Sequence, residues 1–182
     1  YLHRTRHPLA VLTKRKLRQS PRGYGVGSIH VSVRVPEVAE LGLRLLQGLK
    51  FSGLAGVEFK RDARDGKFKL IEINPRSIAI TQLAVVCGVD IPFVAYRDCL
   101  GERVEPNTSF REGVKWINVP KDLESFPEYH RAEGLDLITY VQSWRAPRCF
   151  AYFVWDDPLP GLAYMNRFVN QMVRKWVRAR SS

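Results

Sequence analysis

The stretch GVEFKRDARDGKFKLIEINPR, residues 56–76, decides the fold of this chain. We predict strands at residues 56–61 and 67–74, separated by a turn. The Asp-Gly pair at 65–66 is a strong hairpin signal, because glycine supplies the positive φ that such turns demand. Pro75 ends the second strand, because proline cannot continue a sheet ladder. The stretch therefore predicts a β-hairpin.

Three oxygen-bearing side chains fall on one face of this hairpin. Alternation along a strand puts Glu72 and Asn74 on the same face, and Glu58 lies at nearly equal distance from the turn on the other strand. Two ionised carboxylates about 4 Å apart repel by roughly 1–4 kcal/mol, so a cation should accompany them. Mg²⁺ prefers oxygen ligands, and Arg76 could reach the same anion. Spacing alone leaves a second interpretation open, in which both glutamates are solvated residues of an ordinary hairpin.

Outward from the hairpin, alternating and 3.6-residue patterns predict the other elements. Three glycines at 23, 25 and 27 form a loop that is no P-loop, because no Gly-Lys-Ser/Thr follows. We interpret them either as a mobile loop near an active site or as simple conformational permissiveness. We predict strands at 9–19, 29–34, 113–118 and 149–155, and helices at 36–49, 78–86, 91–100, 121–131, 135–144 and 161–179.

The hairpin motifs resemble the central motif of the ATP-grasp superfamily. Within it they are most similar to the carbamoyl-phosphate-synthase-like, predicted carboxylate–amine ligase group. The resemblance covers about residues 10–102. It is carried by GVEFKRD (56–62), DG (65–66) and LIEINPR (70–76), with KLRQSP (16–21) upstream, QLAVVCGVDIP (82–92) downstream and DDPLP (156–160) in the tail.

This resemblance implies an α+β fold, with an antiparallel sheet flanked by helices as in the C-terminal lobe of ATP-grasp proteins. It implies that Glu58 is the first metal ligand, that Glu72 bridges two Mg²⁺ (or Mn²⁺) ions and that Asn74 is the third ligand. Glu72 and Asn74 would thereby also contact the nucleotide. Arg76 matches an arginine that contacts the transferring phosphoryl group.

Lys16 and Arg18 share a strand face near a position where the superfamily has a basic residue facing substrate or phosphate. The resemblance implies a catalytic and ATP-binding role for Lys16 and an ATP-binding role for Arg18. The bland alternative for both is a solvated surface side chain. After Arg76 the sequence continues with Ser77-Ile-Ala-Ile80, where relatives tend to have an aromatic residue or glycine, so the substrate pocket is not implied.

The activity implied is that of an ATP- and Mg²⁺-dependent ligase, which activates a carboxylate as an acyl-phosphate for attack by an amine. The phosphate-contacting lysines and adenine-hinge residues of the family's earlier lobe have no counterpart here. We therefore expect a partial domain, at residues 1–104, that needs an N-terminal segment or a partner chain to bind ATP well. The alternative is a non-catalytic basic module that binds nucleic acid or an anionic membrane, although no nucleic-acid motif is present.

Composition limits the remaining choices. The formal net charge of +11 indicates a polyanionic partner without selecting one, and the basic residues gather near both ends of the chain. Three scattered cysteines, Cys87, Cys99 and Cys149, make no disulfide framework or zinc site, so we expect a reducing cytoplasm. We leave open whether the chain forms a homo-oligomer.

The C-terminal part, residues 105–182, is expected to be a helical extension packed on the first domain. Its last helix is amphipathic and basic. We leave three roles open for it: lying on an anionic membrane, docking on a partner, or packing on its own domain with a solvated basic face. The apolar stripe is Leu162, Met165, Val169, Met172 and Trp176, and beyond it are Arg174, Lys175, Arg178 and Arg180.

Overall fold

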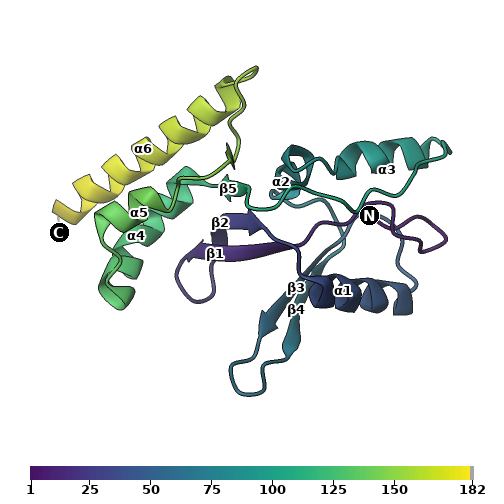
Figure 1. Ribbon diagram of the computed structural model, residues 1–182. Coiled ribbons are helices and arrows are strands. Elements are labelled where there is room, and N and C mark those ends of the chain that lie inside the picture. The colour runs from purple at the N-terminus through teal and green to yellow at the C-terminus, as the bar shows by residue number, and fades with distance from the viewer. Residues whose placement is uncertain (181–182) are drawn as a thin grey trace. The chain divides into compact units, whose positions relative to one another are not determined.

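A computed structural model describes residues 1–180 and divides them between two compact units (Figure 1). Unit 1 contains residues 1–15 and 31–114, and unit 2 contains residues 16–30 and 115–180. The elements in chain order are β1 (Lys14–Ser20), β2 (Val26–Ser32), α1 (Pro36–Gly48), β3 (Gly56–Arg61), β4 (Phe68–Asn74), α2 (Thr81–Val86), α3 (Ile91–Cys99), β5 (Lys115–Ile117), α4 (Val119–Glu133), α5 (Leu137–Gln142), β6 (Arg148–Phe150) and α6 (Leu159–Arg180).

The fold class is α+β, as predicted. The hairpin β3–β4 is antiparallel, and a four-stranded sheet has the order β1-β2-β5-β6. In that sheet β5 and β6 run parallel, so the predicted purely antiparallel sheet becomes a mixed one.

The division into units differs from the predicted boundary after residue 104. Residues 16–30 belong with residues 115–180, because β2 neighbours β5 in the sheet and Asn118 donates its backbone N–H to Ser28. A reading of local patterns places boundaries along the chain, and it misses a unit assembled from two distant segments.

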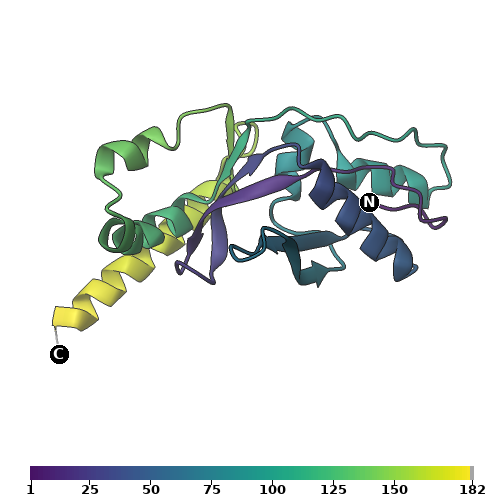
Figure 2. The same ribbon diagram turned by 60° about the horizontal axis from the view of Figure 1, so that its bottom comes forward.

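Unit 1 contains the hairpin and the helices α1, α2 and α3. Helix α1 packs its glycine side on β3, where the space beside Gly42 is filled by Val57 and Phe59. Both views show α1 beside the hairpin (Figures 1 and 2). A separate core forms around Ala10, Ala84 and Val89, with further apolar side chains packed against it.

Three of the predicted element boundaries differ from the observed ones for identifiable reasons. The strand expected from residue 9 begins at Lys14, because Ala10 is buried and forms only an isolated bridge to Asn107. The helix expected from residue 78 begins at Thr81, whose hydroxyl accepts the Ile78 N–H and closes the turn before the helix. The strand expected to run to residue 155 ends at Phe150, and Tyr152 follows with a φ of 64°.

Unit 2 packs α4 and α5 around a buried polar and aromatic centre. Helix α4 begins after Asn118, whose side chain accepts the Lys121 N–H, and it ends at the left-handed Gly134. These are ordinary helix caps. The first turns of α6 also pack within this unit, since Gly161, Tyr164 and Phe168 are half-buried.

In residues 1–180, no helix combines the length and the apolar character needed to cross a membrane. All three cysteines are free.

Candidate functional site

The hairpin has the register that the sequence predicts for its acidic residues. Glu58 and Glu72 are directly opposed across β3 and β4, and a bulge lies between Glu58 and Phe59. The bulge leaves the Gly56 to Glu58 end of the hairpin in register with Asn74 to Glu72 and shifts the remainder by one residue. Bulges commonly re-aim side chains beside functional sites.

The turn is held by its own side chains. Asp62 donates its N–H to the Lys67 carbonyl at 2.8 Å, and its carboxylate accepts both the N–H and the guanidinium of Arg64. These hydrogen bonds hold the pKa of the Asp62 carboxyl below its usual value. Gly66 adopts a φ of 69°, as the predicted turn requires. The turn therefore fixes which residues of the two strands face each other.

Three of the predicted site residues form a chain along β4 and its end. Asn74 donates from Nδ2 to Glu72 Oε1 at 2.7 Å, and Arg76 Nη2 donates to Asn74 Oδ1 at 3.4 Å. Arg76 Nη1 also donates to the Ser77 carbonyl at 3.2 Å. Glu72 and Arg76 are exposed, whereas Glu58 and Asn74 are half-buried. The four residues that the sequence grouped are thus together in unit 1.

The donor set suits a hard divalent cation. Two carboxylates and one carboxamide oxygen lie at adjoining positions of two strands, and such oxygens are the ligands that Mg²⁺ takes. Among the described residues, no group of three or more His, Cys, Asp and Glu side chains forms a metal cluster. A site here would therefore need the amide oxygen of Asn74 and oxygens from the ligand itself.

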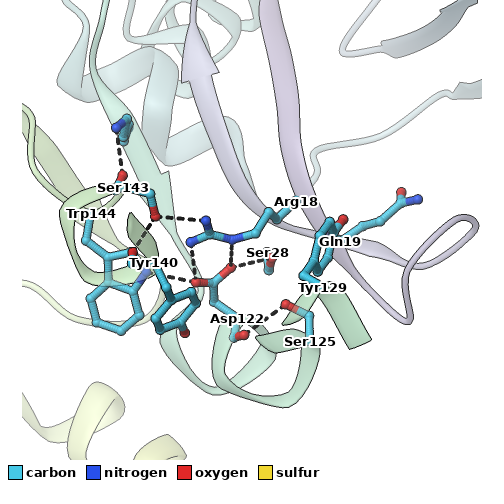
Figure 3. A network of polar contacts seen from close by, with 10 residues as sticks. Arg18, Gln19, Ser28, Asp122, Ser125, Tyr129, Tyr140, Ser143 and Trp144 are labelled. Atoms are coloured by element: carbon cyan, nitrogen blue, oxygen red, sulfur yellow. Dashed lines mark hydrogen bonds and ion pairs between the residues drawn. The ribbon is translucent and has the colours of Figure 1, made fainter. Parts of the chain in front are cut away.

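Lys16 and Arg18 lie in the other unit, on the inward face of β1. Lys16 is half-buried, and its ATP-binding and catalytic role stays a prediction from the resemblance. Arg18 is buried, and its guanidinium is held by Asp122 through Nε at 2.9 Å and Nη2 at 2.7 Å (Figure 3). Its Nη1 donates to Ser143 Oγ at 2.8 Å. These contacts give Arg18 a structural role, since each of its three guanidinium nitrogens donates a hydrogen bond within the chain.

Asp122 is the residue that sequence reasoning missed. It is fully buried, and besides Arg18 it accepts from Ser28 Oγ and from Trp144 Nε1, both at 2.8 Å (Figure 3). Tyr140 packs beside it, and burial together with the Asp122 charge raises the pKa of the Tyr140 phenol. No local signal marks Asp122, because its main partner lies 104 residues away in sequence.

The glycine loop shows a steric reason for two of its glycines, Gly25 and Gly27, and at Gly27 a Cβ would overlap the ring of His30. A Cβ at Gly25 would overlap the backbone of Ser20 and Pro21, so the chain doubles back too closely for any side chain there. Gly23 adopts a φ of 95°, and Gly27 lies within β2. This steric need is a packing reason for glycine at position 25, and both interpretations of the loop stay predictions.

Comparison with known proteins gives one match. The model of a family described as "ATP-grasp in the biosynthetic pathway with Ter operon" matches residues 9–121, which is more than half of the chain and includes every predicted site residue. No curated protein and no solved structure matches the chain. The opposed carboxylates of the hairpin lie inside the matched region, and the chain belongs to this ATP-grasp family.

Proposed function

We propose that this chain carries the metal-binding part of an ATP- and Mg²⁺-dependent ligase, which activates a carboxylate as an acyl-phosphate for attack by an amine. The observation that supports the proposal most directly is the register that opposes Glu58 and Glu72. Membership of an ATP-grasp family supports the reaction class. The identities of the carboxylate and the amine are not part of the proposal.

Electrostatics supports a cation at this position. Two carboxylates on opposed residues of neighbouring strands repel each other, so the hairpin is less stable when both are ionised and no cation is bound. Asn74 offsets part of this cost through its hydrogen bond to Glu72. A bound Mg²⁺ would reduce the repulsion further, and in phosphoryl transfer it would neutralise charge on the β- and γ-phosphates.

The residues of the proposed site would have different roles. Glu58, Glu72 and the amide oxygen of Asn74 would hold the metal, and the 2.7 Å hydrogen bond from Asn74 Nδ2 orients the Glu72 carboxylate. Arg76 supplies fixed positive charge beside them, because its guanidinium is tied to Ser77 and Asn74 within the chain. Positive groups positioned before reaction stabilise the negative charge that develops during phosphoryl transfer.

A metal titration tests the site without requiring the substrates. Mn²⁺ binding to the chain is followed by electron paramagnetic resonance, comparing the wild type with Glu72→Gln and Glu58→Gln. Either substitution should weaken Mn²⁺ binding at least roughly tenfold, as losing a carboxylate ligand does. Glu105→Gln is the matched control, because Glu105 is exposed in the same unit and pairs with Arg103. Equal Mn²⁺ affinity in all four proteins would exclude the metal site.

Turnover tests the reaction. ATP hydrolysis and amide formation by the full-length polypeptide should fall to background in Glu72→Ala and stay at the wild-type rate in Glu105→Ala. Unchanged turnover in Glu72→Ala would rule out the assignment even if Mn²⁺ still binds.

A further inference from the structure

Helix α6 has an unusual charge pattern. Its 22 residues include five basic side chains, Arg167, Arg174, Lys175, Arg178 and Arg180, and no acidic one. The side chains of Lys175, Trp176 and residues 178–180 lie outside the described part. The described cations, Arg167 and Arg174, are seven residues apart and both are exposed, so they share one face of the helix.

The two halves of the helix have different surroundings. In the first turns Tyr164 packs its ring against Tyr152 with centroids 4.5 Å apart, and Gly161 lies so close to Phe153 that a Cβ would come within 2.8 Å of it. Phe168 is the last half-buried residue among those described. Packing on its own unit therefore accounts for the first half of α6 only.

Beyond Phe168 an apolar stripe is left exposed. All described side chains of residues 169–177 are exposed, and they include Val169, Met172, Val173 and Val177. Val169 and Met172 expose 49% and 46% of their surface. Leu162 continues the stripe toward the start of the helix. A continuous exposed apolar face marks a contact surface.

From this combination we propose that α6 lies along an anionic lipid surface, with Val169, Met172 and Val173 in the headgroup boundary and the arginines attracted to acidic headgroups. A helix with an apolar face, a basic polar face and no acidic residue is typical of interfacial binding. Anionic lipids complement the charge of α6, and the acyl boundary takes up its apolar stripe.

Other occupants satisfy only part of this pattern. A second copy of α6 would bring five positive charges against five others with no acidic residue to compensate. Nucleic acid would bind the basic side chains, but it has no apolar region in which the exposed apolar stripe could be buried. The proposal is independent of the ligase activity, since neither Glu58 nor Glu72 belongs to unit 2.

Flotation of the whole chain with lipid vesicles tests the proposed contact between α6 and an anionic lipid surface. The chain is mixed with vesicles of phosphatidylcholine alone or with half phosphatidylglycerol, at low and at high salt. It should float with the anionic vesicles only, and less at high salt because screening weakens the attraction. No flotation, or equal flotation with both vesicle types, would overturn the proposal.

Two pairs of variants locate the surface. Val169→Ser combined with Met172→Ser should weaken binding about tenfold or more, because about two buried apolar side chains are lost. Leu137→Ser combined with Val141→Ser is the matched control, since these α5 residues are 63% and 56% exposed in the same unit. All four side chains are exposed, so thermal unfolding should be unchanged in both variants. Equal losses in both would place the lipid contact outside α6.

The charge is tested in the same way. Arg167→Glu combined with Arg174→Glu should weaken binding roughly tenfold or more. Arg44→Glu combined with Arg103→Glu changes the net charge equally at exposed positions of unit 1 and should keep most of the binding. If both pairs lose binding equally, only net charge matters. If the wild type is a dimer that Val169→Ser with Met172→Ser converts to a monomer, the stripe binds a second copy. Either result overturns the proposal.

Discussion

Asp122 is the most heavily engaged side chain of unit 2. Its two carboxylate oxygens accept four hydrogen bonds, from Arg18 twice, from Ser28 and from Trp144. A buried ion pair of this kind adds little stability over an apolar replacement, but removal of one partner leaves a charge without compensation. Integrity of unit 2 therefore depends on both members being present.

We expect Asp122→Ala to lower the free energy of unfolding by about 3–5 kcal/mol, measured by urea denaturation. The control is Glu133→Ala, which removes the partner of Arg22 from an ion pair that is about half exposed. That loss should stay below about 1 kcal/mol, because solvent screens the pair. Equal losses in the two variants would contradict the structural role of Asp122.

Arg76 is a second single residue whose role can be tested, at the proposed ligase site. We expect Arg76→Ala to lower kcat roughly 10²–10³-fold, because a fixed charge facing the transferring group is removed. Mn²⁺ affinity should change little, since Arg76 is no metal ligand. The control is Arg64→Ala, where an exposed arginine binds only the turn residue Asp62. A kcat loss in Arg64→Ala of the same size would remove Arg76 from the site.

At the scale of elements, the loop between β1 and β2 places Gly25 against the backbone of Ser20 and Pro21. Gly25→Ala should lower the free energy of unfolding by about 1–3 kcal/mol, because the new methyl group overlaps the backbone of Ser20 and Pro21. Gly48→Ala, in α1, has open space around it and should be neutral or stabilising by up to about 1 kcal/mol. Thermal unfolding of the two variants separates steric need from simple glycine flexibility.

The stability that the cap of helix α5 provides should depend on pH. Asp136 caps it by accepting the Thr139 N–H at 2.9 Å, and hydrogen bonds to Thr139 lower the pKa of its carboxyl below 3.8. The pKa is lower in the folded state, so the stabilisation is complete above the ordinary pKa and is lost as pH falls through the lower value. The midpoint of thermal unfolding of the wild type should therefore exceed that of Asp136→Ala at neutral pH, and the difference should shrink as the pH falls below 3.8. A difference that is constant with pH would contradict the charged cap.

The elements also show where sequence reasoning succeeds. The β3–β4 hairpin was predicted with its register, because the turn pair Asp65-Gly66 and the alternation of Glu72 and Asn74 are local signals. The grouping of Asn74 with Arg76 followed from the same few residues. The start of β1 was wrong because burial of Ala10 depends on residues of another segment, Ala84 and Val89. Arg18 looked like a phosphate ligand because its partner Asp122 is remote in sequence.

At the scale of the whole molecule, unit 2 is assembled from residues 16–30 and 115–180. The piece that sequence patterns suggest as a separate extension, residues 105–182, lacks β1, β2 and the Arg18 and Ser28 partners of Asp122. We expect that piece alone to show no cooperative thermal unfolding by circular dichroism, whereas the entire chain does. A cooperative transition of the isolated piece would show that β1 and β2 are dispensable.

The two-segment unit has a consequence for synthesis. Arg18 is added to the growing chain 104 residues before Asp122. At 5–20 residues per second this is an interval of about 5–20 s. During this interval β2 has no β5 beside it, and the Arg18 guanidinium has no carboxylate from α4. A nascent chain stalled before residue 115 should therefore hold β1 and β2 as an open edge, available to chaperones until the second segment emerges.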